Sequence, residues 1–385
     1  MFYRLMIWLG IGLVLLLPLS TKAQEDPLSV VIEEQLSHLD LTGIREFLAD
    51  LEPEVRELLP PFDVRSIIRG EGFADLGEIL LAMLRYLWGE VFLQTRLMGQ
   101  LMVLVVLCSL LQNLQRGLPA GASELAFAVC MAVLTVLALQ SFLSAAQVGS
   151  RTIDSMVSFM QALLPTMATL LVAVGAISSA AIFSPMLLAV TTAVGTLIEG
   201  LVFPLIFIAA VLGIAGNFSA EFPLSRLAGL VRTGCIALLG VVFSLFLGIM
   251  VVRGAIAPVA DGAALRTAKF LTGTLVPVIG GMFADAVEVV VGGSLLIKNA
   301  IGALGLTAVG LTAAFPMMKI ASAIILYRLV AAMVQPISEP RLTQALGSMA
   351  DSLTLLFVAV GTVALMFFVA ITMIIGVGNL AALAR

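Results

Sequence analysis

The stretch MLLAVTTAVGTLIEGLVFPLIFIAAVLGIAG, residues 186–216, decides the fold class of this chain. It holds a single charged residue, Glu199, in 31 positions. A helix needs about 20 mainly apolar residues to cross the hydrocarbon core of a bilayer. The stretch is therefore long enough to span a membrane, and Pro204 inside it predicts a helix break or kink.

The rest of the chain has the same character. It is 61% hydrophobic and 11% charged, whereas soluble domains are about 45–50% apolar and 25% charged. Further runs approach or exceed the length of a span. We therefore predict an all-α polytopic integral membrane protein with about seven to eight transmembrane or re-entrant helices. The net charge of −4 is small and argues against a nucleic-acid partner.

The first 23 residues have the layout of a cleavable signal peptide. Arg4 precedes an apolar run over residues 5–19, and the small-residue site Thr21-Lys22-Ala23 follows. An uncleaved anchor is the alternative. Under either interpretation residues 24–77 form an extracytoplasmic helical region and residues 78–385 the polytopic transmembrane domain. The loop 253–269, with three bases against one acid, then lies in the cytoplasm.

The extracytoplasmic region carries one apolar stripe and many charges. Its apolar residues recur at helical spacing, which predicts an amphipathic helix. A region this short buries little core by itself, so we expect it to pack on the membrane domain or on a partner. The stripe consists of Leu41, Ile44, Phe47, Leu48 and Leu51.

An internal repeat is a further hypothesis. Phe203-Pro204 and Phe315-Pro316 are 112 residues apart, as are Leu163-Leu-Pro165 and Leu275-Val-Pro277. Interrupted apolar segments at corresponding positions of two halves indicate transporter-like pseudo-symmetry. The halves would be residues 151–252 and 266–377, with Pro204 and Pro316 at equivalent helix breaks. Chance matching in an Ala-, Leu- and Gly-rich chain is the alternative.

A second apolar segment, FADAVEVVVGGSLLIK at residues 283–298, carries three charges. Asp285 and Glu288 are three residues apart and share one helical face, whereas Lys298 lies about 15 Å beyond Glu288. The pairs Gly280-Gly281 and Gly292-Gly293 bracket the acids and predict two hinges. Intramembrane charges face a partner or a wet cavity. We therefore expect a short spanning, re-entrant or interfacial helix whose acids, like Glu199, face polar surroundings.

Catalytic, cofactor and metal motifs are missing from the sequence. It has neither a glycine-rich phosphate loop nor a His-Glu-x-x-His pair, and its one histidine, His38, lies outside the membrane. Cys108, Cys130 and Cys235 fall in apolar spans without metal-ligand or disulfide spacing. We therefore predict no catalytic residue, no cofactor and no metal, and that the chain is not an enzyme.

One block resembles a known family. The sequence APVADGAALRTAKFLTGTLVPVIGGMFADAVEVVVGGSLLIKNAIG, residues 257–302, is similar to the stage III sporulation protein AE family of endospore-forming Firmicutes. The order of signal peptide, short acidic external region and hydrophobic segments resembles that family too. The resemblance covers essentially the whole chain, and it carries over no catalytic residue.

The resemblance implies a function that composition does not give. It implies a membrane subunit of the secretion-like transenvelope channel complex between mother cell and forespore, required for sporulation and late forespore gene expression. The implied partners are the other stage III sporulation A-operon membrane proteins and a forespore-side membrane protein. The implied location is the mother-cell membrane around the forespore. A secondary transporter or permease with buried acids, and a membrane scaffold, are the alternatives.

Overall fold

The computed structural model describes residues 27–51, 53–60, 64–69, 72, 75–114, 120–217, 224–275 and 280–383. The predicted signal peptide lies outside these ranges. The described residues are all-helical, without a β-strand among them. The elements are α2 (Pro27–His38), α3 (Thr42–Ala49), α4 (Pro53–Leu58), α5 (Val64–Ile68), α6 (Leu76–Leu93), α7 (Thr95–Leu114), α8 (Ala120–Ala173), α9 (Ile177–Leu197), the π-helix η2 (Ile198–Val202), α10 (Phe203–Ala215), α11 (Ser225–Leu275), α12 (Gly280–Val334) and α13 (Pro340–Leu383).

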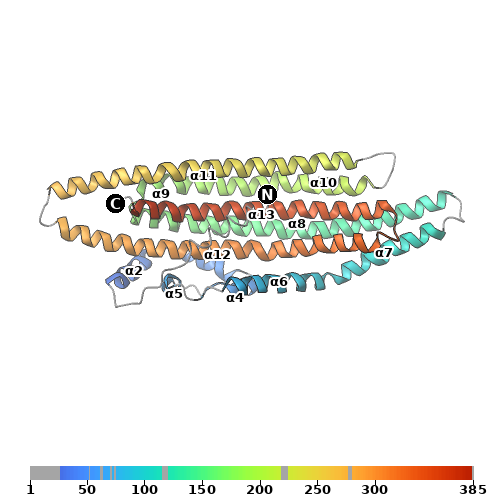
Figure 1. Cartoon of the computed structure of the whole chain (residues 1–385), viewed down its shortest axis with the longest axis horizontal. Coiled ribbons are helices and arrows are strands. Elements are labelled where there is room, and N and C mark those ends of the chain that lie inside the picture. Colours follow the sequence, from blue (N-terminus) through green and yellow to red (C-terminus); the bar gives the residue numbers. More distant parts are fainter. Residues whose placement is uncertain are drawn as a thin grey trace.

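The molecule is an elongated bundle whose long helices run along one axis (Figure 1). Helices α8, α11 and α12 contain 54, 51 and 55 residues. At 1.5 Å per residue each is about 80 Å long, more than twice the roughly 30 Å hydrocarbon core of a bilayer. Each of these helices therefore extends well beyond the length of a single span.

The number of spans differs from the sequence-based expectation. Five helices of the described chain are long and apolar enough to cross a membrane, or six if the bent pair α6–α7 forms one span. The expected seven to eight are not confirmed, because segments that the sequence suggests as separate spans are continuous. The sequence suggests separate spans near residues 124–146 and 163–183 with an amphipathic stretch at 151–161 between them, and these segments lie mostly in the single helix α8.

Helices α12 and α13 pack against each other and against α8 in the middle of the bundle. Buried α13 residues recur every three or four positions, so one stripe of the helix faces the core. This stripe consists of Leu353, Leu356, Val360, Val363, Phe367 and Ile371, each at most 1% exposed.

A tight turn reverses the chain between α8 and α9. Gly175 has φ 86°, in the left-handed region that favours glycine. The amide of Ala176 donates to the carbonyl of Leu171 at 2.8 Å, and the amide of Gly175 donates to Val172 at 2.8 Å. This pair of hydrogen bonds is a Schellman C-cap. It satisfies carbonyls at the end of α8 and sends α9 back along the bundle.

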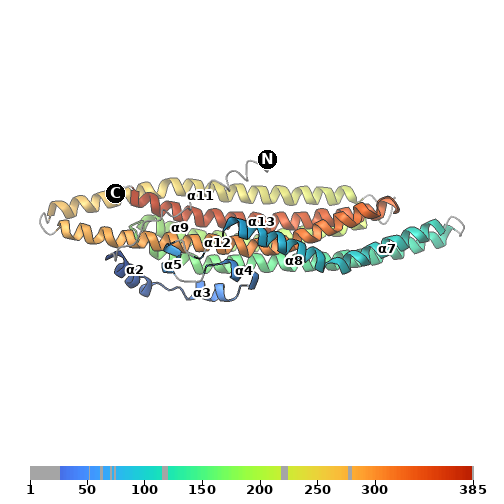
Figure 2. The same ribbon diagram turned by 60° about the horizontal axis from the view of Figure 1, so that its bottom comes forward.

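Helices α2 to α5, residues 27–69, form what we call the N-terminal layer. Figures 1 and 2 show it along one side of the bundle, beside α12. Leu41 and Ile44 of the apolar stripe are buried, and the ring of Phe47 lies 4.5 Å from that of Phe159 in α8. The Thr166 hydroxyl of α8 donates to the carbonyl of Asp40 at 3.1 Å. In the structure this region packs on the long apolar helices.

The residues predicted to break helices are in two kinds of setting. Pro204 is the second residue of α10, which directly follows η2. Helix α12 begins at Gly280-Gly281 and continues without interruption through Gly292-Gly293 and Pro316. The expected short helix between two glycine hinges is therefore replaced by the start of a long helix. Packing offsets the cost of about 1 kcal/mol per helical glycine and about 3 kcal/mol for the proline. The internal repeat stays a prediction.

Candidate functional site: charged and polar groups inside the bundle

Lys298 is fully buried between α12 and α13. Its Nζ donates to the carbonyl of Ile375 at 2.6 Å and to Oδ1 of Asn379 at 2.9 Å. Gly378 lies so close that a Cβ there would be 2.3 Å from Nζ. Among the described residues no acid forms an ion pair with this lysine. Two neutral oxygens therefore hold the ammonium, and the close approach of α13 at Gly378 makes that possible.

Asp285 and Glu288 lie in the first turns of α12. Their side chains lie outside the described part of the structure, so their orientation toward a polar site stays a prediction. Helix continuity places Lys298 on the same rod, about 15 Å beyond Glu288. The lysine and the two acids are therefore parts of one long helix and not of the short helix expected from the sequence.

Glu199 lies on the π-helical turn η2 and is half-buried. The Ser150 hydroxyl of α8 donates to its Oε1 at 2.7 Å. Pro204, four residues after Gly200, has no N–H and its ring crowds the Gly200 carbonyl. The wider π turn accommodates this conflict. Such π turns are frequent at functional sites, so Glu199 keeps its place as a candidate.

A polar cavity of about 300 Å³ lies where the α6–α7 bend meets α8 and α12. The two helices of the bend meet at 44°, with Gln94 between them. Glu90 of α6 is buried, and its Oε1 lies 3.8 Å from Nζ of Lys319 in α12. The side-chain Nε2 of Gln94 donates to the Ser322 hydroxyl at 2.8 Å. Other polar residues that line the cavity are Gln100, Gln140, Ser141 and Ser144.

The chemistry of this cavity suits a small polar solute or water. It combines a carboxylate, an ammonium, amides and hydroxyls, so it offers donors and acceptors of both charges. At about 30 Å³ per water, its volume corresponds to roughly ten waters. The sequence did not reveal this site, because Gln94, Gln140 and Lys319 are far apart in the chain and meet only through helix packing.

Three spans meet in an ionic cluster that sequence reasoning also missed. Arg232 of α11 pairs with Asp351 of α13 at 3.0 Å and donates to the Ser348 carbonyl at 2.7 Å. Arg328 of α12 reaches the other oxygen of Asp351 at 3.4 Å. The Arg232 side chain is 19% exposed. One carboxylate therefore links α11, α12 and α13, and the signal available in the sequence was a lone acid near the start of the last span.

Asp261 of α11 is buried against the start of α9. Its carboxylate accepts hydrogen bonds from the amides of Ser178, at 2.8 Å, and Ser179, at 3.2 Å, and from the Ser179 hydroxyl. The first amides of a helix lack intrahelical partners, and a carboxylate there is also stabilised by the helix dipole. Asp261 thus caps α9 from a distant helix. The sequence suggested only a cytoplasmic loop residue.

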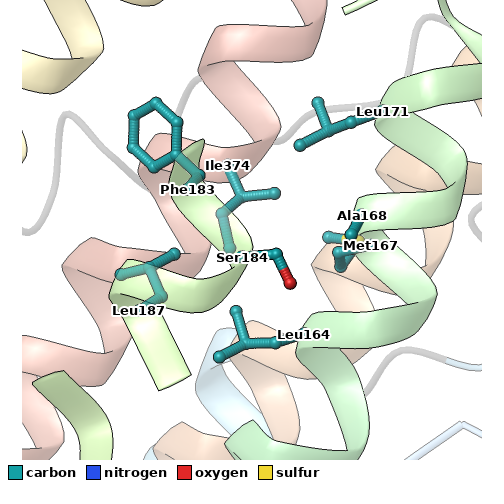
Figure 3. Close-up of a pocket in the computed structure, with 8 residues that line it drawn as sticks. All are labelled: Leu164, Met167, Ala168, Leu171, Phe183, Ser184, Leu187 and Ile374. Atoms are coloured by element: carbon teal, nitrogen blue, oxygen red, sulfur yellow. The ribbon is translucent and has the colours of Figure 1, made fainter. Parts of the chain in front are cut away.

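A small apolar gap separates α8, α9 and α13 (Figure 3). Its volume of about 10 Å³ is at the lower limit for one water. Figure 3 shows Ser184 of α9 among apolar side chains, including Phe183 and Ile374. This gap is a packing feature and is too small for a ligand. Among the described residues no group of three His, Cys, Asp or Glu side chains could hold a metal ion.

The long apolar helices and the charges held between them define a polytopic helical membrane protein. A model of the family described as stage III sporulation protein AE matches residues 63–378. The chain therefore belongs to the stage III sporulation protein AE family.

A relative in Bacillus subtilis (strain 168), stage III sporulation protein AE, is 38% identical over 352 residues, which cover 90% of this chain and 88% of that protein. No solved structure matches the chain. The family is one of sporulation membrane proteins and is not a known enzyme family.

Proposed function

We propose that this protein is a membrane subunit of the transenvelope, secretion-like channel complex between mother cell and forespore. In this proposal it lies in the mother-cell membrane around the forespore and assembles with other stage III sporulation A-operon proteins and a forespore-side membrane protein. The observation that carries the proposal is the 38% identity to the Bacillus subtilis relative over nearly the whole of both chains.

The size of the polar cavity at the α6–α7 bend supports a subunit role. A space of about 300 Å³ accommodates a small solute and not a polypeptide. A conduit for large cargo would then be formed between subunits. The ionic cluster and Lys298 hold α11, α12 and α13 together through polar contacts. A component of a larger assembly needs such fixed contacts between its helices.

The genetic test is deletion of the gene in its host. The deletion strain should complete engulfment, lose late forespore transcription and form few heat-resistant spores. An intact copy expressed in the mother cell should restore both, whereas a copy expressed only in the forespore should restore neither. Normal spore yield in the deletion strain would refute the proposal.

The acids at the start of α12 provide a residue-level test. Lipid exposure of two carboxylates would be costly, so we expect both acids to face a polar site. Replacing Asp285 with Asn and Glu288 with Gln should therefore leave the protein inserted at its normal level and lower late forespore transcription. Loss of the protein from the membrane would indicate a folding role. Sporulation equal to that of the parent would show that the acids have no role in the complex.

The polar cavity favours a second candidate function, a transporter of small zwitterionic solutes. In that case the purified chain in proteoliposomes should take up labelled amino acids under an ion gradient, and Lys319→Met should abolish uptake. Arg328→Met, which alters a charge outside the cavity, is the control. Absence of uptake by the purified chain, together with the deletion phenotype above, would leave the channel-subunit proposal.

A further inference from the structure

The outward face of the N-terminal layer is charged. Between residues 33 and 69, seven acidic and four arginine side chains are exposed among the described residues. The other face of the layer packs on α12. The side-chain Nε2 of Gln35 donates a hydrogen bond to the carbonyl of Val290 at 3.0 Å, and Leu51 and Val55 pack with Phe315. A patch of exposed charge therefore covers the part of the candidate span of α12, residues 289–334, that runs from Val290 to Phe315.

The covered length is comparable to a bilayer. From Val290 to Phe315 the layer follows α12 for about 37 Å, more than the roughly 30 Å of the hydrocarbon core. Charged side chains in hydrocarbon are costly and occur where they reach a partner or water. This face of α12 is therefore not in contact with lipid over that length.

The opposite face of the bundle is apolar at the same level. Figures 1 and 2 both show α11 on the side of the bundle away from the layer. Leu245 and Ile249 of α11 are 63% and 41% exposed. No Asp, Glu, Lys or Arg occurs between Arg232 and Arg253, over 20 residues. That length and composition match a lipid-facing helix surface.

Contacts across the bundle establish the common level. Gly254 of α11 lies beside Met373 of α13. Two residues further along α13, Ile375 lies beside Gly302 of α12, which also faces Met167 of α8. The neighbouring Thr166 bonds to Asp40 in the layer. Helices α11 and α12 run in opposite directions (Figure 1), so the apolar run 233–252 lies level with α12 beyond Gly302, where Leu51 and Val55 of the layer pack on Phe315. Over this part of the layer, the exposed charges and the apolar surface of α11 share one depth and lie on opposite sides of the bundle.

We propose that the bundle is two-sided at bilayer depth, with α11 against lipid and the N-terminal layer lining a water-filled space. Water is favoured over a protein partner because the exposed charges have mixed sign, and an interface would have to desolvate them. The Arg65–Glu33 pair, with side chains 54% and 72% exposed, is arranged as on a solvated surface. The inference rests on the proposed function for the identity of that space.

Cysteine accessibility tests the two sides separately. Glu46→Cys and Glu57→Cys place thiols on the layer, and Leu245→Cys and Ile249→Cys place them on α11. The parent chain provides the blank, since its three cysteines are buried. Membranes from sporulating cells, opened so that both faces are reached, are treated with a charged maleimide. A lipid-soluble aryl diazirine is then mapped on the parent chain by mass spectrometry.

We expect the layer thiols to react on the order of tenfold or more faster than the α11 thiols, because thiolate does not form in hydrocarbon. The diazirine should label residues 233–252 and spare residues 33–69. Rapid reaction of all four thiols would place this half of the bundle outside the bilayer and overturn the inference. Unreactive layer thiols would overturn it by showing a cover of lipid or protein. The pattern is independent of spore yield, so its failure is distinct from failure of the proposed function.

Discussion

Substitution of Gly378 by Ala tests how Lys298 is held inside the bundle. The new Cβ would lie 2.3 Å from Nζ and 3.0 Å from both Cδ and Cε of the lysine. The side chain would have to move away from the Ile375 carbonyl and from Asn379, which now lie at 2.6 and 2.9 Å. The substitution therefore disturbs the only polar contacts of a fully buried cation described in the structure.

The expected loss of stability is large. Overpacking costs about 1–3 kcal/mol, and loss of one hydrogen bond to a charged group costs about 1.5–3 kcal/mol. The higher helix propensity of alanine offsets about 1 kcal/mol of this loss. We therefore expect a net loss of about 3 kcal/mol. In a Lys298→Ala background the methyl group added at position 378 enters the space that the lysine side chain has left, so Gly378→Ala should stabilise the protein by about 1 kcal/mol. The effects of Gly378→Ala in the two backgrounds then differ by about 4 kcal/mol, which is the coupling energy between the two positions.

The assay is unfolding in mixed detergent micelles, followed by circular dichroism, for both single variants and the double variant. Gly376→Ala is the matched control, since it lies two residues away in α13 and a Cβ added there would have no other atom within 4 Å. It should be neutral or slightly stabilising. Equal stability of the Gly376→Ala and Gly378→Ala variants would refute the reasoning.

Three further variants test other contacts. Asp261→Ala should speed amide exchange in the first turn of α9, through loss of about 1–2 kcal/mol of capping; unchanged exchange would contradict the cap. Arg232→Met should lower the free energy of unfolding by about 1–2 kcal/mol, reduced from the fully buried value because Asp351 is half exposed; a neutral effect would show that the cluster is solvated. The amide of Thr42 holds the pKa of Asp40 below its ordinary value of 3.8. The stabilisation of the folded state by this hydrogen bond is present above pH 3.8 and is lost as the pH falls through the folded-state pKa of Asp40. Proteolysis near Asp40 should therefore increase below pH 3.8 in the parent chain and not in the Asp40→Asn variant.

Apolar run length was enough to predict the fold class. Residues 186–215 lie in a helical rod from Ile177 to Ala215, and Leu41, Ile44 and Leu51 of the apolar stripe are buried as its spacing indicates. The continuity of α8 was not predictable from these patterns. Polar residues such as Arg151 and Asp154 suggest a connection between spans, and only the packed structure shows that the helix continues through them.

The candidate site was predictable only where one segment carried the signal. Lys298 stands out as a charge in an apolar run, and it is buried. The Arg232–Asp351 pair joins residues 119 positions apart, and each alone resembles a charged residue at the end of a span. The cavity around Glu90 and Lys319 depends on the packing of four helices, α6, α7, α8 and α12, which periodicity in one helix does not encode.

The length of α12 has a mechanical consequence. An uninterrupted helix of 55 residues is a stiff rod. The N-terminal layer contacts it from Val290 to Phe315, and Lys319, four residues further on, forms part of the wall of the cavity at the α6–α7 bend. A partner that tilts the end of the layer at Val290 would therefore displace Lys319, which lies about 44 Å further along the rod, so the rod acts as a lever between the N-terminal layer and the polar cavity.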